Sequence, residues 1–328
     1  MSFPPARQTL LAALSVAALA IGPARAQEAP EQIVNAMNKL WGSHAGFRAN
    51  HAKGVVVEGS FTGAKQAASL SKAPLFTGAA IPITVRFSDA TGIPTLPDGE
   101  ANANPHGMAI KFHMPDASEF DMVTNSLKTF PVATAEDFRD LLIAISVSGP
   151  GSAKPTKLEQ FVAAHPSVPR ASGTLATPSS FARETYNGVN AFVFVNAAGT
   201  RQPFRFRIDP VAGTDHLTPA DAARQAPDFL MSELPARLGR EPVVFRLMAQ
   251  LANPGDPTKD ATIAWPADRK LVEIGTITLT KAVADSADAQ KKLLFLPTNL
   301  PTGIEPSDDP LIDARTQAYA ISFTRRSQ

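Results

Sequence analysis

The chain has 328 residues, with 31 Lys and Arg against 30 Asp and Glu, and it contains no cysteine. This near-neutral balance argues against nucleic acid as a partner, because phosphate backbones are bound by clustered Lys and Arg side chains. Without cysteine no disulfide can form, so stability must come from a buried core, which about 300 residues are enough to build.

The first 26 residues have the pattern of an export signal. Arg7 supplies a positive charge, residues 10–21 are apolar, and Ala24-Arg25-Ala26 matches a cleavage site with small residues at alternate positions. The apolar run is too short to span a bilayer comfortably, so a membrane anchor is the weaker alternative. We predict a secretory signal peptide over residues 1–26, a mature chain without a membrane span, and a periplasmic location.

The spacing of apolar residues next predicts a short amphipathic helix over residues 31–41. Four segments with strand character follow, over residues 54–61, 83–88, 107–113 and 120–125, each bounded by Gly, Pro or Asp. Thr134 and Asp137 have the spacing of a helix N-terminal cap, and a further helix is expected over residues 157–165.

A second set of strands is predicted over residues 191–195, 204–208, 243–251 and 271–279. In residues 204–208 apolar side chains alternate with charged ones, Arg205 among them, which is typical of a sheet with one face in water. Two sets of four strands with helices between them predict an α+β fold, an eight-stranded antiparallel β-barrel with surrounding helices. No repeat, charge block or long linker divides the chain, so we expect residues 27–328 to form a single domain.

The common enzyme signatures are absent from the sequence. The six histidines show no zinc-binding spacing, and there is no nucleophile elbow, Walker loop or dinucleotide-binding glycine motif. Taken singly, the remaining polar segments have structural explanations, such as a hydrogen-bonded histidine before a strand or an i,i+4 pair on a helix. These segments are "RANHAKG" (48–54), "RFS" (86–88), "NPHG" (104–107), "FDMVTN" (120–125) and "RTQAY" (315–319).

In this order, the five segments resemble those of the haem catalases, specifically the shortened catalase-related peroxidases. Family members carry R-x-x-H-A-K-G, R-F-S, a D-P-R-G-like turn, a W-D-x-V-x-N-like segment and R-x-x-x-Y. The resemblance extends from about residue 40 to residue 326. It implies the catalase-like haem-binding fold and haem b as the cofactor, and the sequence lacks the C-x-x-C-H motif of covalent attachment.

The resemblance assigns Tyr319 as the proximal ligand of the haem iron. A phenol must lose its proton to ligate ferric iron. Arg315 lies one helical turn away, so its guanidinium has the spacing to stabilise the phenolate through a charge-assisted hydrogen bond.

On the distal side, the resemblance implies that His51 shuttles a proton, as general base and then general acid. Asn125 matches the asparagine that binds and polarises peroxide, and Ser88 matches the serine that bonds to the histidine and fixes its tautomer.

The resemblance places the remaining candidates around the cofactor. Arg48, Arg86 and Arg326 match the arginines that pair with the haem propionates. Phe138 has the spacing of a phenylalanine that lines the distal pocket, although a place in the helix core explains it equally well.

The implied function is a haem peroxidase that reduces hydrogen peroxide with electrons from a small organic donor. Organic peroxides are further candidate substrates. Weaker catalase activity and protection against peroxide accompany it. Two alternatives stay open, a lipid hydroperoxide isomerase of the same fold and a haem-binding protein without catalysis. The isomerase needs no external reductant, and the binding protein has no need of His51 and Asn125.

Three features depart from the pattern of the large catalases. Asn50 stands where they usually carry an apolar residue, and Phe323 where they often carry histidine. Nine residues follow Tyr319, and there is no long N-terminal arm. We therefore expect a haem that bulky reductants can reach, and a monomer or loose dimer in place of an interlocked tetramer.

Overall fold

Residue 1 and residues 28–327 are the part of the chain that the computed structural model describes. The predicted export signal and its cleavage after Ala26 therefore lie outside the described residues, apart from Met1.

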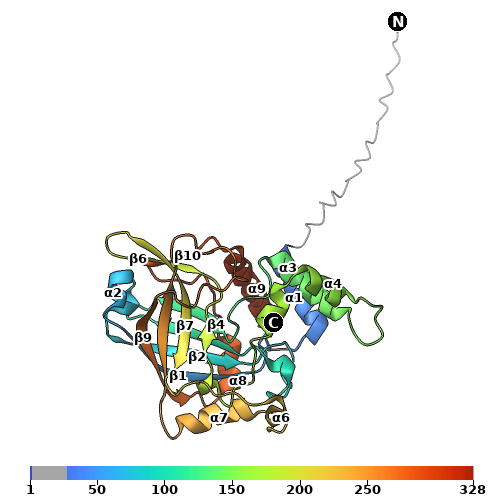
Figure 1. The fold of residues 1–328 in the computed structure, drawn as a ribbon, viewed down its shortest axis with the longest axis horizontal. Coiled ribbons are helices and arrows are strands. Elements are labelled where there is room, and N and C mark those ends of the chain that lie inside the picture. Colours follow the sequence, from blue (N-terminus) through green and yellow to red (C-terminus); the bar gives the residue numbers. More distant parts are fainter. Residues whose placement is uncertain (2–27, 328) are drawn as a thin grey trace.

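Within residues 28–327, eight strands form a closed antiparallel barrel, as the sequence predicts (Figure 1). Around the ring the order is β7–β5–β4–β3–β2–β1–β9–β8, and β8 pairs back with β7. The bounds of the strands are β1 (Gly54–Gly63), β2 (Ala80–Ser88), β3 (Gly107–His113), β4 (Glu119–Asn125), β5 (Tyr186–Asn187), β7 (Arg201–Pro210), β8 (Val243–Leu251) and β9 (Leu271–Ala282).

The barrel closes through β5, a strand that the sequence does not predict. Asn187 of this two-residue strand pairs with Asn125 on one side and with Arg207 on the other. The predicted strand at residues 191–195 exists as β6 (Phe192–Val195), but it pairs with β7 and with β10 (Ile304–Pro306), outside the ring. Two residues are too few to show a period, so only the neighbouring strands identify β5.

Alternation along the strands separates the barrel core from a second face. Ile83, Val85 and Phe87 of β2 are at most 2 % exposed and belong to the main hydrophobic core. Arg86 and Ser88 project to the opposite face, because successive side chains of a strand point in opposite directions. An eight-stranded barrel leaves just enough interior for such side chains, so its centre is packed and the site lies outside it.

The prediction that Arg205 faces water is wrong. Arg205 is only 6 % exposed. Its guanidinium donates to the backbone oxygens of Ile263 at 2.7 Å and Asp260 at 3.1 Å, and it lies 4.6 Å from the centre of the Trp265 ring. The segment after β8 covers Arg205, and no pattern within β7 indicates that cover. Arg207, two residues further along the same face, is exposed as predicted.

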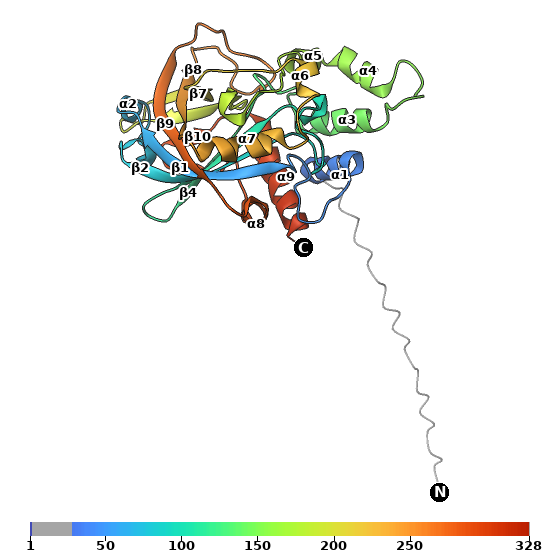
Figure 2. The same ribbon diagram turned by 90° about the horizontal axis from the view of Figure 1, so that it is seen from below.

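Helices surround the barrel, and Figures 1 and 2 both show α1, α3 and α9 gathered on one side of it. Their cluster of buried residues includes Val34, Met37, Leu142 and Ala318. The helices are α1 (Ala29–Trp41), α2 (Ala67–Leu70), α3 (Ala135–Ser146), α4 (Lys157–Ala164), α5 (Ser167–Ser172), α6 (Pro219–Ala222), α7 (Phe229–Leu238), α8 (Ser286–Lys292) and α9 (Pro310–Arg326), with short 3₁₀ turns at Pro74–Phe76, Ala101–Ala103 and Phe181–Arg183.

The helix starts follow the sequence signals. Pro30 occupies the first turn of α1, where its missing N–H costs nothing. The Thr134 side chain accepts the backbone N–H of Asp137 at 3.1 Å, which confirms the predicted cap of α3.

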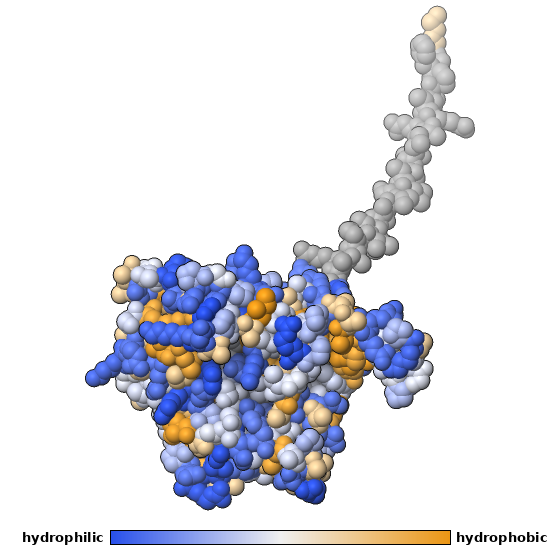
Figure 3. All heavy atoms as spheres, in the orientation of Figure 1, coloured by the Kyte–Doolittle hydropathy of each residue, from blue (hydrophilic) through white to orange (hydrophobic). Residues whose placement is uncertain are grey.

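The face of the molecule in Figure 3 is mainly hydrophilic, and its apolar areas are interrupted by hydrophilic residues. Ile143, Ile145 and Val147 are exposed at the end of α3. None of the helices in residues 28–327 combines the length and the apolar character needed to cross a membrane.

Candidate active site

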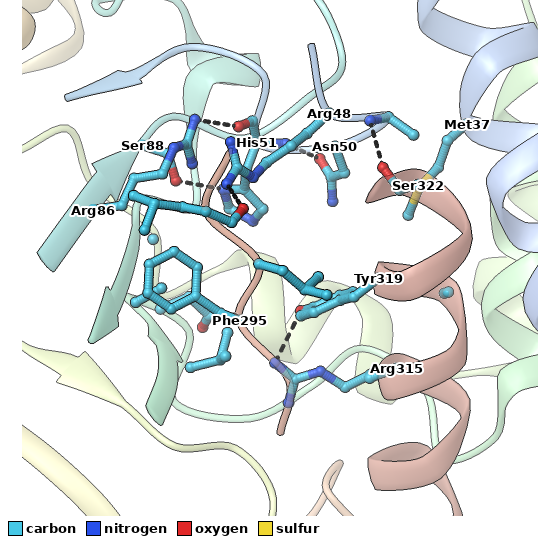
Figure 4. Close-up of a pocket in the computed structure, with 18 of the residues that line it drawn as sticks. Met37, Arg48, Asn50, His51, Arg86, Ser88, Phe295, Arg315, Tyr319 and Ser322 are labelled. Carbon is cyan, nitrogen blue, oxygen red and sulfur yellow. Dashed lines mark hydrogen bonds between the residues drawn. The ribbon is translucent and has the colours of Figure 1, made fainter. Parts of the chain in front are cut away.

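A cavity with an empty volume of about 1040 Å³, part of it open to solvent, lies between strands β2–β4 and helices α1, α3 and α9. All the residues predicted for the site line it: His51, Ser88, Asn125, Arg48, Arg86, Arg315, Arg326, Phe138 and Tyr319. In Figure 4, His51 and Tyr319 enter from different walls, one from the loop before β1 and the other from α9. The structure thus brings together residues that are up to 278 positions apart, from residue 48 to residue 326.

Helix α9 supplies one wall through a single face. Arg315, Tyr319, Ser322 and Arg326 line the cavity. Their spacings of four, three and four residues place them along one stripe of the helix. Ser322 Oγ accepts the backbone N–H of Ala49 at 3.1 Å, so this face is also tied to the loop that carries His51.

His51 is positioned by the backbone conformation of that loop and by two contacts from β2. Its backbone φ is 56°, in the left-handed region that side chains other than glycine seldom adopt. Arg86 donates to the backbone oxygen of His51 at 2.7 Å, and His51 Nδ1 lies 3.1 Å from Ser88 Oγ. The Ser88 contact uses one ring nitrogen and leaves Nε2 for proton transfer in the cavity.

The charge state of His51 follows from its surroundings. Burial, and then the positive charge of Arg86, lower the pKa of His51 from 6.5 to about 4. The imidazole is therefore neutral at neutral pH and able to accept a proton.

Gly107 makes the contact between His51 and Ser88 possible. It pairs with Ser88 across β2 and β3. A Cβ atom at this position would lie 2.8 Å from Ser88 Oγ and 3.2 Å from His51 Nδ1. Any side chain would therefore push the two hydrogen-bonded groups apart.

Three arginines gather at one end of the cavity without a carboxylate. Arg48 donates to the backbone oxygens of Gln290 at 3.1 Å and Leu293 at 2.7 Å, and Arg326 donates to Leu293 O at 2.6 Å. Arg86 Nε donates to Gln290 Oε1 at 3.0 Å. Among the described residues, none of these three guanidiniums lies within ion-pair distance of an Asp or Glu.

The pKa values of the arginines reflect this crowding. Burial lowers the pKa of Arg48, and the charges of Arg86 and Arg326 lower it further. Burial, and then Arg326, lower the pKa of Arg86 to about 9, and burial lowers that of Arg326 to about 10. The buried Nε of Arg326 has no hydrogen-bond partner. Such a cluster fits a ligand that carries two carboxylates, because anions would offset the mutual repulsion of the arginines and could accept from the unpaired donor.

A hydrogen-bonded chain lies behind Tyr319. Arg315 donates to the Tyr319 hydroxyl at 3.1 Å and, through its other terminal nitrogen, to Asn190 Oδ1. Asn190 Nδ2 in turn donates to Asp309 Oδ2 at 2.7 Å. Asp309 also accepts the N–H of Leu311 at the start of α9, and burial raises its pKa. This chain holds the guanidinium against the tyrosine oxygen.

The sequence interpretation does not include Asn190 and Asp309. Asn190 is 125 residues from its partner Arg315, and neither residue stands in a motif that indicates the contact. Both interpretations of Phe138, as a residue of the pocket and as a residue of the helix core, agree with the structure. It lines the cavity, and its ring also packs against that of Phe130 with 5.2 Å between the ring centres.

The cavity residues fit a haem. The arginines suit its two propionates, Tyr319 offers an oxygen ligand for the iron, and His51 enters from a different wall. Asn125, at the end of β4, also lines the cavity. A closed antiparallel barrel that carries this site on its outer side is the architecture of the catalase-like proteins. The sequence model of the family described as Catalase matches residues 31–327, and the chain belongs to this family.

The relatives cover nearly the whole chain. A catalase-related peroxidase of Mycolicibacterium paratuberculosis is 35 % identical over 302 residues, which span 91 % of this chain and 95 % of the relative. A catalase-related peroxidase of Synechococcus elongatus is 33 % identical over 324 residues, with 98 % and 94 % covered. A catalase of Pseudomonas syringae is 31 % identical, but the match covers only 56 % of its length.

Solved structures share the fold. A bacterial catalase superposes with a TM-score of 0.77 at 22 % identity, over 87 % of this chain and 58 % of the other. A fungal catalase gives 0.75 at 18 % identity, over 87 % and 60 %.

Proposed function

We propose that the protein is a haem-dependent peroxidase that reduces hydrogen peroxide with a small organic electron donor and has weaker catalase activity. The observation that carries this proposal is a cavity in which the Tyr319–Arg315 pair and the His51–Ser88 pair meet three arginines that have no carboxylate partner among the described residues. The two relatives named catalase-related peroxidase, which match almost end to end, support it. Haem b as the cofactor, a periplasmic location, a protective role against peroxide and a monomer or loose dimer are parts of the same proposal.

The cofactor and the residues divide the work. When bound, the haem supplies the redox chemistry that cleaves the oxygen–oxygen bond and then accepts electrons from the donor. Tyr319, held by Arg315, would ligate the iron, and Arg48, Arg86 and Arg326 would bind the propionates.

His51 moves the proton. Its neutral Nε2 takes a proton from one peroxide oxygen and returns it to the other, which leaves as water. Ser88 keeps the imidazole in the required tautomer, and Asn125 binds the peroxide by hydrogen bonding. In total, peroxide, two electrons and two protons give two waters, and the organic donor supplies the electrons and protons.

Reconstitution tests the proposal. The purified chain is titrated with haemin, and peroxide consumption is measured with and without a phenolic or azo-dye donor. We expect a haem absorption band, peroxide-dependent oxidation of the donor, and slower dismutation without donor. A protein that binds no haemin contradicts the proposal outright. Rearrangement of a lipid hydroperoxide with no donor consumed identifies an isomerase, and haem binding with no turnover identifies a carrier.

A further inference from the structure

Asn50 lies next to His51 on the loop before β1 and lines the same cavity (Figure 4). Its Oδ1 accepts the backbone N–H of His51 at 3.0 Å. An amide nitrogen cannot accept a hydrogen bond, so this contact decides which way the amide is oriented. The oxygen is committed to the loop, and Nδ2 is left on the cavity side.

Nδ2 of Asn50 has no hydrogen-bond partner within residues 28–327, and this nitrogen is not fully buried. It is therefore a donor with access to the cavity. In Figure 4 the Asn50 side chain extends from its loop into the space between His51 and Tyr319.

Asn125 is oriented in the same way. Its Oδ1 accepts the backbone N–H of Leu127 at 2.9 Å, which again leaves Nδ2 as the free end of the amide in the cavity. The site thus holds two amides, one from the loop before β1 and one from the end of β4, beside a single base. The resemblance assigns a role to Asn125 and none to Asn50.

We propose that Asn50 is a second amide donor of the site. Its Nδ2 donates a hydrogen bond to a small bound ligand, such as a peroxide or an anion, and stabilises the negative charge that develops on this ligand as His51 takes the ligand's proton. The proposal rests on the proposed function. N–H groups that are aimed in advance at a developing negative charge stabilise it strongly in a site with little water. The backbone bond to His51 supplies this orientation, because it holds the amide whether or not a ligand is present.

The test uses haemin-loaded protein and two ligands of equal size. Cyanide binds as an anion that accepts hydrogen bonds, whereas nitric oxide is neutral and accepts them weakly. Dissociation constants of both are measured by absorption titration for the original chain and for Asn50→Val, which keeps a similar volume without a donor. We expect the cyanide constant to rise about tenfold or more, and the nitric oxide constant to change less than about twofold.

Other outcomes overturn the proposal. If Asn50 only anchors the loop, Asn50→Val displaces His51 and changes the dissociation constants of cyanide and nitric oxide equally, or leaves both unchanged. Asn50→Ala repeats the test with a smaller side chain should the valine variant bind less haemin. Asn125→Val is the positive control and should show the same selective weakening of cyanide binding relative to nitric oxide. Failure of the proposed function itself is recognised before any ligand is added, because the absorption spectrum of the original chain with haemin then shows no binding.

Discussion

At the scale of single residues, the two tyrosines of the chain show how surroundings divide one side-chain type into two roles. The Tyr186 hydroxyl donates to the backbone oxygen of Phe181 at 2.9 Å inside the core, and burial raises the pKa of Tyr186 well above its usual value. The Tyr319 hydroxyl instead accepts from Arg315 at the edge of the cavity. The core therefore keeps one phenol protonated, whereas the cavity presents the other to a ligand.

Exchange of each tyrosine for phenylalanine tests this division. Tyr319→Phe removes the oxygen that would bind iron, so we expect the haem spectrum to change and donor oxidation to fall at least about a hundredfold. Tyr186→Phe loses one buried hydrogen bond, which should cost about 1 kcal/mol of unfolding free energy and leave the spectrum unchanged. Absorption spectra and urea unfolding measure the two effects. An unchanged spectrum in Tyr319→Phe would refute the assignment of the ligand.

The lowered pKa of His51 predicts a pH dependence of stability. Its folded-state pKa is about 4 against 6.5 when unfolded, so the unfolded chain binds the proton more readily. The contribution is complete above about pH 6.5 and is lost as the pH falls through about 4, with a total of about 3 kcal/mol. Urea unfolding of the haem-free protein across this range should show that the free energy of unfolding falls. In His51→Gln this part of the pH dependence should be absent. Parallel curves for the two proteins would contradict the shift.

At the scale of elements, strand pairing sets the distances in the site. Gly54 of β1 and Gly107 of β3 both pair with Ser88 at the end of β2, so the loop before β1 and the start of β3 meet at this serine. A slip of one residue in either pairing would turn Ser88 away from His51, because side chains alternate between the two faces.

Gly107→Ala tests this register. Its new Cβ would meet Ser88 Oγ at 2.8 Å and separate it from His51, and a displacement of this kind lowers turnover by about 10- to 100-fold. Gly149→Ala is the matched control, because a Cβ at Gly149 meets no atom within 4 Å. Steady-state peroxidase assays compare the two variants, and equal turnover would show that the glycine is not needed for the contact.

At the scale of the whole molecule, the site joins parts that are otherwise separate. The loop that carries His51, strands β2–β4, the segment after α8 and helix α9 all contribute to its lining. A ligand that binds only this folded arrangement stabilises the entire molecule by mass action.

Haemin should therefore raise the melting temperature. At a free concentration of about 100 times its dissociation constant, the expected gain in unfolding free energy is about 2.7 kcal/mol. Iron-free protoporphyrin is the control, since it keeps the propionates for the arginines but offers no iron to Tyr319. Calorimetry should show a smaller gain with the iron-free ring and with Tyr319→Phe. Equal gains for both rings would contradict ligation by Tyr319.

Much of the fold and the site is predictable because it depends on local patterns. The strands Gly107–His113 and Val243–Leu251 have the predicted bounds, and the capping threonine marks the start of α3. Period-two alternation places Arg86 and Ser88 on one face, and helical spacing aligns Arg315 with Tyr319. The sequence by itself thus determined which side chains share a face and in what order the site residues occur.

Only the tertiary structure decided which distant groups meet. Closure of the barrel through β5, the burial of Arg205 and the link from Asp309 through Asn190 to Arg315 depend on segments that no local period connects. The orientation of the Asn50 amide belongs here as well, because it follows from one hydrogen bond and the shape of a loop. Backbone periodicity acts over a few residues, whereas these contacts are set by how the packed elements close around one another.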